Sequence, residues 1–279
     1  MSVMKFGDKS LDLSLPHVMG ILNVTPDSFS DGGQHNSLDA ALRQAEKMLQ
    51  DGATFIDIGG ESTRPGAAEV SEQEELDRVL PAVEAIAQRF DTVISVDTST
   101  PSVICESAKL GAGLINDVRA LERDGAVAAA AKTGLPVCLM HMRGTPKDMQ
   151  SAPSYDALID DVEQYLLERV AVAEAAGIKR DQILLDPGIG FGKTLTHNAT
   201  LLNHTQRFVD LGFEVLIGVS RKTMIGDILG LPVDQRLYGT MGANASTYLK
   251  GARIFRVHDV KPHVEMLKVM HQIEESRNA

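Results

Sequence analysis

The sequence predicts a single (β/α)8 TIM barrel with long loops after its first and second strands, and three observations support this fold class. At 279 residues, the chain has the size of one such barrel. Eight apolar runs along it are typical of strands, and six of them follow a glycine of the kind that ends a helix. Helical patterns fill the gaps, and strands that alternate with helices form a parallel sheet. We therefore predict one domain over residues 1–279, with an open doubly wound sheet as the alternative.

The predicted strands are short apolar runs bounded by glycine or polar residues. Two of them are VMGILN from Val18 and TVISVD from Thr92. The six that follow a glycine are DGATFIDIG from Asp51, LGAGLIND from Leu110, TGLPVCLMH from Thr133, AGIKRDQILLD from Ala176, LGFEVLIG from Leu211 and KGARIFRVH from Lys250.

The predicted helices combine spaced apolar positions with charged ones, and the clearest cover residues 38–50, 72–89, 155–176 and 259–275. Two helix starts carry a specific signal. Ser71 and Glu74 have the spacing of a capping box. Thr100 before Pro101 fits an N-cap residue followed by proline at the first helical position.

Composition and charge limit the possible partners. With 27 basic and 38 acidic side chains, the net charge of −11 argues against binding to nucleic acid or to an anionic membrane surface. No apolar run approaches the roughly 20 residues that cross a bilayer, and the N-terminus lacks an apolar secretory core. We expect a cytoplasmic protein in which Cys105 and Cys138 pack as small hydrophobic side chains.

Polar residues follow every predicted strand, at the end of the barrel where active sites of this fold lie. Helix capping or strand termination explains a single Asn or Asp, and we favour that explanation for Glu61 and Asp117. Charged groups that converge on one rim need a ligand or one another, because an unpaired buried charge is costly. In chain order, the residues are Asn23; Gly60 and Glu61; Asp97; Asn116 and Asp117; His141; Asp186; Ser220, Arg221 and Lys222; Arg256 and His258.

These residues divide by charge into two sets. Asp97, Asn116 and Asp186 offer acceptors and an amide to a ligand rich in N–H groups, such as an amino-pyrimidinone. The second set offers donors to an anion, for which phosphate or diphosphate is the usual occupant. Its members are Arg64, Lys222, Arg256 and His258.

The segment DPGIGFGKT from Asp186 matches neither common phosphate-binding motif. Pro187 stands where a Walker A loop needs glycine, and the third glycine of a dinucleotide motif comes one residue early, at Gly192. A tight turn that approaches a flat ligand, with Phe191 available to stack, is the better explanation. The histidines lack zinc spacing, so the metal that we expect is Mg²⁺, which takes few protein ligands beside substrate phosphates.

Eight segments in order along nearly the whole chain resemble bacterial dihydropteroate synthase. Several of these motifs are individually specific. They are GILNVTPDSFSDGG from Gly20, DIGGESTRPGA from Asp57, ISVDT from Ile94, INDV from Ile115, MHMRGTP from Met140, LDPGIGFGK from Leu185, GVSRK from Gly218 and RVHDV from Arg256.

The resemblance implies a transferase of folate biosynthesis. Such an enzyme joins 7,8-dihydropterin-6-ylmethyl diphosphate to para-aminobenzoate, and it releases pyrophosphate and dihydropteroate. The family is dimeric, uses magnesium and is the target of sulfonamides, so the resemblance also implies a homodimer, bound Mg²⁺ and these two substrates.

Residue roles carried over from the family fall into three groups. The pterin-binding residues implied are Asp97, Asn116, Asp186 and Lys222, with Met140, Phe191 and Gly218 around the ring. The diphosphate-binding residues implied are Asn23, Thr63, Arg256 and His258, and Asn23 also binds magnesium. The para-aminobenzoate-binding residues implied are Phe29, Arg64, Pro65 and Ser220.

The resemblance also explains the long polar loops. NVTPDSFSDGG from Asn23 is expected to be a mobile catalytic lid, with STRPGA from Ser62 as its partner loop. Loss of diphosphate from an electron-rich pterin leaves a stabilised cation, which favours an SN1-like path with Asp31 facing the cation. The residues expected to act in catalysis are Asp31, Lys222, Arg256 and His258.

Two other functions share part of this pattern. A methyltransferase barrel that binds a methylated folate would keep Asp97, Asn116 and Asp186, but it would not need NVTPDSFSDGG, STRPG and SRK. A noncatalytic pterin-binding protein would be favoured by losses at Asn23, Lys222 or Arg256, and all three are present.

Overall fold

The protein is a closed barrel of eight parallel strands, which confirms the predicted fold class. The computed structural model describes residues 3–25, 34–62, 70–145, 149–151 and 153–276, those at 34–37 by their backbone alone. Around the barrel, the strand order is β10-β3-β4-β5-β6-β7-β8-β9. The strands are β3 (His17–Asn23), β4 (Phe55–Gly59), β5 (Val93–Asp97), β6 (Leu114–Asp117), β7 (Val137–Met140), β8 (Ile183–Asp186), β9 (Glu214–Ile217) and β10 (Ile254–Val257).

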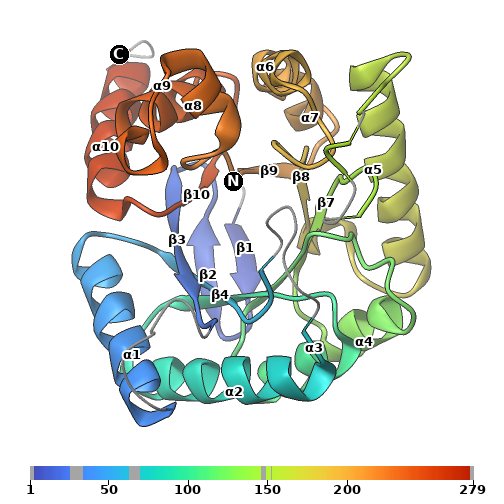
Figure 1. The fold of residues 1–279 in the computed structure, drawn as a ribbon. Helices are drawn as coiled ribbons and strands as arrows, with labels where there is room; N and C mark the ends of the chain where they lie inside the picture. Colours follow the sequence, from blue (N-terminus) through green and yellow to red (C-terminus); the bar gives the residue numbers. More distant parts are fainter. Residues whose placement is uncertain (1–2, 26–33, 63–69, 146–148, 152, 277–279) are drawn as a thin grey trace.

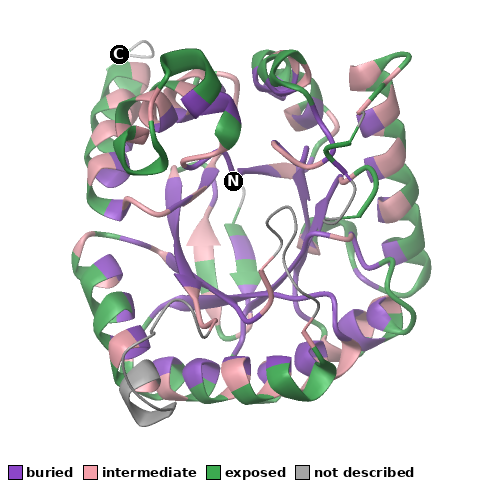
Figure 2. Cartoon of the chain, viewed as in Figure 1, coloured by how far each residue is buried: buried purple, intermediate pink, exposed green. Residues whose placement is uncertain are grey.

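Helices form an outer ring around the strands (Figure 1). Figure 2 shows that they turn buried positions toward the barrel and exposed positions outward, as amphipathic packing requires. Within the described segments, no helix is long and apolar enough to cross a membrane. The helices are α1 (Gln34–Gln50), α2 (Glu72–Arg89), α3 (Pro101–Lys109), α4 (Ala126–Thr133), α5 (Leu158–Ala175), α6 (Leu195–Asn203), α7 (Thr205–Val209), α8 (Thr223–Leu229), α9 (Leu237–Tyr248) and α10 (Val260–Glu275), with short 3-10 turns η2 (Arg180–Gln182) and η3 (Val233–Gln235).

The predicted boundaries between helices and strands are confirmed at their glycines. All six have a left-handed backbone, with φ between 69° and 109°, so a side chain there would be strained. They are Gly52, Gly111, Gly134, Gly177, Gly212 and Gly251.

One predicted helix start is confirmed, and the other differs in its chemistry. Ser71 and Glu74 form the capping box at α2. Thr100 stands before Pro101 at the start of α3, but its side chain makes no capping hydrogen bond. Its hydroxyl donates instead to the carboxylate of Glu75 on α2, at 2.5 Å. This carboxylate is buried and needs hydrogen-bond donors. Four predicted bounds also change: α1 begins at Gln34, α5 begins at Leu158 and ends at Ala175, and α10 begins at Val260.

An antiparallel hairpin that the sequence did not predict covers the amino-terminal end of the barrel. It consists of β1 (Val3–Phe6) and β2 (Lys9–Asp12), and Figure 1 shows it across the interior of the ring. Met4 and Phe6 pack against the lowest layer of barrel side chains, and Phe6 meets Phe55 edge to face. That layer also contains Cys138, fully buried as expected, where burial raises the pKa of the thiol. This end is therefore apolar.

Candidate active site

The carboxyl ends of the strands bring the predicted polar residues together at the other end of the barrel. Strand β5 ends at Asp97, which is in register with Gly59 of β4 and with Asn116 of β6. Strand β7 ends at Met140, opposite Asp186 of β8. In a closed parallel barrel, these positions face one rim.

Arg256, on β10, joins the carboxylates of two other strands. Its Nε donates to Asp57 Oδ2 at 2.6 Å, and its Nη2 donates to Asp97 Oδ2 at 2.9 Å. Asn116 Nδ2 donates to Asp57 Oδ1 at 3.3 Å. One guanidinium therefore fixes the positions of two carboxylates, and a shared carboxylate links it to the Asn116 amide.

Asp57 is a site residue that the sequence reasoning missed. Its side chain is fully buried, and it also accepts a hydrogen bond from Ser95 Oγ at 2.5 Å. The signal was available, because a charged residue in the middle of the apolar run FIDIG needs a buried partner. The identity of that partner was not available, since Arg256 lies 199 positions away.

Asp186 and Lys222 are neighbours at the same rim, and their opposite charges attract each other. A Cβ placed on Gly218 would lie 3.8 Å from Asp186 Oδ2 and 4.0 Å from Lys222 Nζ, so the glycine leaves both groups accessible. Lys222 Nζ also donates to the carbonyl oxygen of Ile189 and lies 4.4 Å from the centre of the Phe191 ring. A cation next to an aromatic face provides a polar edge and a flat surface for a planar ligand.

We call the charged and amide residues of this rim the mouth cluster. They share one electrostatic environment, since the charges of Arg256 and Lys222 both act on Asp186. The members of the mouth cluster are Asp57, Asp97, Asn116, Asp186, Lys222 and Arg256.

Burial moves the pKa values of Asp97 and Lys222 toward neutrality. It raises the pKa of Asp97 to about 7, although Arg256 opposes the change, and the Asp57 carboxylate adds to it. It lowers the pKa of Lys222 to about 8, against the attraction of Asp186. For Arg256, the two carboxylates outweigh burial and raise the pKa further, so the guanidinium stays charged.

Beside the mouth cluster, the ends of β9 and β10 are joined by a hydrogen-bonded pair. Ser220 Oγ lies 2.9 Å from His258 Nδ1, and the His258 backbone N–H donates to the same oxygen at 3.1 Å. In the SRK motif, Arg221 stands between the predicted site residues Ser220 and Lys222. Its side chain pairs with Asp259 at the start of α10, at 2.5 and 2.9 Å. Ser220 and His258 therefore keep a fixed relation to each other.

Asn23, at the end of β3, is compatible with the expected magnesium. A Cβ on Gly59 would lie 3.8 Å from Asn23 Oδ1 and 3.8 Å from Asp97 Oδ2, so glycine leaves room between an amide oxygen and a carboxylate oxygen. Hard oxygen atoms are the ligands that Mg²⁺ prefers, and phosphate and water complete its shell. Across the described part of the chain, no three His, Cys, Asp or Glu side chains form a metal-binding group by themselves.

Asp117 has the structural role that we favoured, a side-chain to backbone hydrogen bond, whereas for Glu61 the structure shows a different contact. Asp117 accepts hydrogen bonds from the backbone of Arg119 and Leu121, at 2.8 and 2.9 Å. Glu61 instead pairs side chain to side chain with Arg119, through two contacts of 3.1 Å. Five predicted site residues lie outside the described residues, and these are Phe29, Asp31, Thr63, Arg64 and Pro65.

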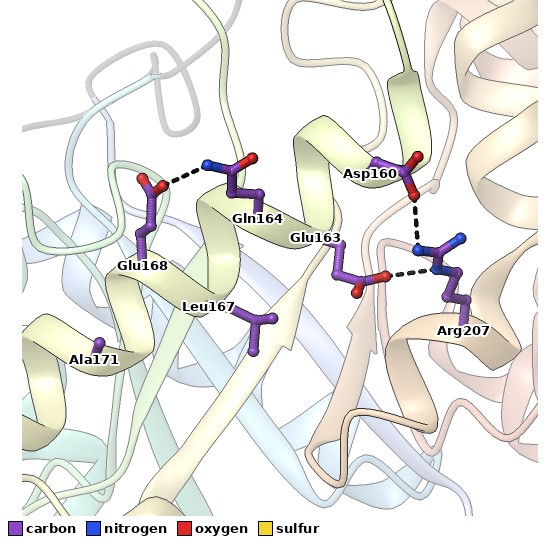
Figure 3. Close-up of a pocket in the computed structure, with 7 residues that line it drawn as sticks. All are labelled: Asp160, Glu163, Gln164, Leu167, Glu168, Ala171 and Arg207. Atoms are coloured by element: carbon purple, nitrogen blue, oxygen red, sulfur yellow. Dashed lines mark hydrogen bonds and ion pairs between the residues drawn. The ribbon is translucent and has the colours of Figure 1, made fainter.

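A cavity on the outer surface lies away from this rim. It is lined by residues of α5 and by Arg207 of α7, and Arg207 pairs with Asp160 and Glu163 (Figure 3). Arg207 is therefore paired with carboxylates of the cavity itself. The exposed Leu167 lies next to this group on α5. The mouth cluster therefore remains the candidate active site.

Comparison with known proteins assigns the barrel and its site to a class. Residues 19–258 match the pterin binding enzyme family, and the chain belongs to that family. Within it, the chain groups with the dihydropteroate synthases. It is 59% identical to the dihydropteroate synthase of Escherichia coli K12 over 261 residues, which cover 94% of this chain and 93% of that protein. The Bacillus subtilis dihydropteroate synthase is 46% identical over 270 residues, with coverage of 96% and 90%.

Solved structures agree with this grouping. The Yersinia pestis dihydropteroate synthase in complex with a sulfonamide drug has a TM-score of 0.93 and 56% identity, and it covers 99% of this chain and 100% of that one. The Xanthomonas albilineans dihydropteroate synthase with 4-aminobenzoic acid has a TM-score of 0.92 and 44% identity, with 98% of each chain covered.

Proposed function

We propose that the chain condenses 7,8-dihydropterin-6-ylmethyl diphosphate with para-aminobenzoate, acting as a transferase of folate biosynthesis. The observation that carries the proposal is the convergence of Asp97, Asn116, Asp186, Lys222 and Arg256 on one rim. This chemistry matches a flat ring rich in N–H groups that carries an anionic tail. The identity to dihydropteroate synthases supports the same reaction.

In this proposal, the pterin ring lies across the mouth cluster. Asp186 and Asp97 accept hydrogen bonds from the ring N–H groups, and the Asn116 amide reads a further edge. Lys222 donates to a ring acceptor, while Phe191 supports the ring. Met140 and Gly218, both buried at strand ends, complete the lining of the ring site.

In this proposal, the diphosphate lies beside Arg256 and His258. The family resemblance adds Asn23 and Thr63 as further diphosphate-binding residues. Arg256 is the strongest donor, because its guanidinium remains charged at every pH where the enzyme would work. Mg²⁺, when bound at Asn23, would neutralise negative charge on the departing pyrophosphate. Fixed donors of this type each contribute on the order of 3 kcal/mol to the transition state.

The second substrate approaches from the side of the loops. Ser220, together with Phe29, Arg64 and Pro65, would hold para-aminobenzoate with its amine toward the pterin methylene carbon. The C–O bond to diphosphate breaks first, the amine nitrogen then forms the new C–N bond, and it loses one proton. Because an aromatic amine is already nucleophilic, orientation and exclusion of water matter more than a strong base. Asp31 would stabilise the intermediate pterin cation.

The test is a pyrophosphate-release assay with both substrates. We expect release that depends on para-aminobenzoate and on Mg²⁺, and inhibition by a sulfonamide that competes with para-aminobenzoate. A methyltransferase barrel or a noncatalytic pterin-binding protein would release none. Asp186→Ala should abolish binding of the pterin diphosphate in calorimetry, and retained affinity would rule out the proposed ring contact.

A homodimer is the assembly that we propose from the family resemblance. Exposed apolar side chains on α8, η3 and α9 offer a candidate surface, and they are Ile228, Leu229, Val233 and Tyr238. Sedimentation would test it, because Tyr238→Ser together with Ile228→Ser should give monomers if this surface is the interface. A cytoplasmic location stays a prediction from the sequence.

A further inference from the structure

Lys193 is the least exposed lysine or arginine in the described part of the chain, with 3% of its surface exposed. Among the residues that the structure describes, no carboxylate pairs with its Nζ. Instead, four acceptors surround it: the carbonyl oxygens of Gly188 at 2.9 Å, Phe191 at 3.0 Å and His141 at 3.3 Å, and the Nδ1 atom of His141 at 2.8 Å. A buried amino group without a carboxylate needs an explanation.

Through these acceptors, Lys193 links the segments that follow two neighbouring strands. Gly188 and Phe191 belong to the loop after β8, and His141 follows the last residue of β7. The contact is close, since a Cβ on Gly188 would lie only 1.7 Å from the His141 carbonyl oxygen. The same Gly188 presents its N–H to Asp186 Oδ1 at 2.7 Å. Lys193 thus holds the backbone that supports the Asp186 carboxylate and the Phe191 ring.

The charge of Lys193 also matters to the mouth cluster. That cluster has three carboxyl groups, Asp57, Asp97 and Asp186, but only two cations, Lys222 and Arg256. When all three carboxyl groups are ionised, a third cation nearby balances the charge of the cluster.

Lys193 is placed to be that cation. Its nearest titratable neighbour, His141, has its pKa lowered to about 2 by burial and is therefore neutral, so its Nδ1 can accept from an ammonium group. Burial lowers the pKa of Lys193 well below its usual range, the Asp186 carboxylate opposes this change, and Lys222 adds to it. The three carbonyl oxygens around Nζ favour the ammonium form, because a neutral amine has only two N–H donors. The remaining cation near His141 is Arg143.

We propose that Lys193 is a positioning residue for the pterin site: its ammonium group clamps the loop after β8 to the end of β7 and supplies the third cation that keeps Asp186 ionised. The inference rests on the proposed role of Asp186 in pterin recognition. It assigns to the last residue of DPGIGFGK a function that needs no contact with substrate.

The experiment compares Lys193→Met and Lys193→Gln with the wild type. Affinity for 7,8-dihydropterin-6-ylmethyl diphosphate is measured by calorimetry between pH 5.5 and 8.5. Lys193→Met should weaken binding at least tenfold at pH 7.5, with the KM for para-aminobenzoate changed less than twofold. Both variants remove a cation next to Asp186, so the pKa of Asp186 should rise in both. The acid limb of pterin binding, to which Asp97 and Asp186 both contribute, should therefore move to higher pH by about one unit.

The glutamine variant distinguishes the two roles of Lys193, its hydrogen bonds to the backbone and its positive charge. Its amide can still donate to two of the carbonyl oxygens, so Lys193→Gln should melt closer to the wild type than Lys193→Met while showing the same pH shift. Lys132→Met, at an exposed lysine of α4, is the matched control and should match the wild type in both measurements. Circular dichroism verifies that each variant is folded.

Two results would overturn the inference. One is wild-type affinity in a folded Lys193→Met protein; the other is weaker binding without a shift in the pH profile, which would reduce Lys193 to a structural residue. Failure of the proposed function would look different, because the wild type itself would then bind no pterin diphosphate and release no pyrophosphate.

Discussion

Asp57→Asn is the sharpest test of how the mouth cluster is organised. The carboxylate is fully buried and accepts from Arg256 Nε at 2.6 Å and from Ser95 Oγ at 2.5 Å. Asparagine keeps the volume and one acceptor oxygen, but it removes the charge and adds an NH₂ group that faces donors. Arg256 then has Asp97 as its remaining charged partner.

The expected loss of stability follows from these bonds. A hydrogen bond to a charged group contributes about 1.5–3 kcal/mol, against about 1 kcal/mol for a neutral one. Weakening the bonds from Arg256 and Ser95 should together reduce the free energy of unfolding by roughly 2–3 kcal/mol. At about 2–4 °C per kcal/mol for a chain of this size, the melting temperature should fall by roughly 5–10 °C.

Although Asp57→Asn should lower the stability of the protein, it should improve pterin affinity at acidic pH. Asp97 must be ionised to accept from the pterin, and its pKa of about 7 means that wild-type binding weakens as the pH falls through 7. Asp57→Asn removes a negative neighbour and leaves Arg256 to Asp97 alone, so the pKa of Asp97 should fall by about one unit. The variant should therefore keep its pterin affinity to a lower pH.

Calorimetry with the pterin diphosphate between pH 5.5 and 8.5 checks this, with thermal melts alongside. Asp39→Asn, at an exposed carboxylate of α1, serves as the control and should leave both measurements unchanged. An acid limb that stays in place or moves to higher pH in Asp57→Asn would show that Asp57 does not set the charge state of Asp97.

Three further predictions concern other residues. Because burial lowers the pKa of Lys222 to about 8, pterin affinity should fall as the pH rises through 8, and Lys222→Met should abolish that alkaline limb in calorimetry. Gly188→Ala would place a Cβ 1.7 Å from the His141 carbonyl oxygen and should cost about 2–4 kcal/mol in urea unfolding, whereas Gly212→Ala, with nothing within 4 Å, should cost about 1 kcal/mol; equal costs would contradict the close contact. Asp31→Ala should leave binding of the pterin diphosphate largely intact but lower turnover in the pyrophosphate assay, and normal turnover would remove Asp31 from the mechanism.

The fold could be predicted because its signals are local. Each glycine such as Gly52 or Gly177 marks the end of a helix, and the apolar run after it marks a strand, so eight repeats predict a barrel without any knowledge of contacts. The hairpin β1–β2 escaped prediction, since two strands of four residues carry too little periodicity to stand out.

The site was predicted where polar residues follow apolar runs in the sequence, and it was missed where residues act through long-range partners. Asp97 and Asp186 stand at visible boundaries. Asp57 sits inside a strand, and its role depends on Arg256 at the far end of the sequence. Lys193 bonds chiefly to backbone carbonyl oxygens, which any residue type can provide, so no sequence pattern identifies its partners.

The hairpin β1–β2 makes one end of the barrel apolar, so that this end contributes to stability while the opposite end holds the candidate active site. Phe6 packs within an apolar cluster at this end. Substitutions around it should therefore change the free energy of unfolding and leave the geometry of the mouth cluster in place. Engineering for heat resistance can therefore start from the base, and a heat-stable variant obtained there should turn over substrate at an undiminished rate.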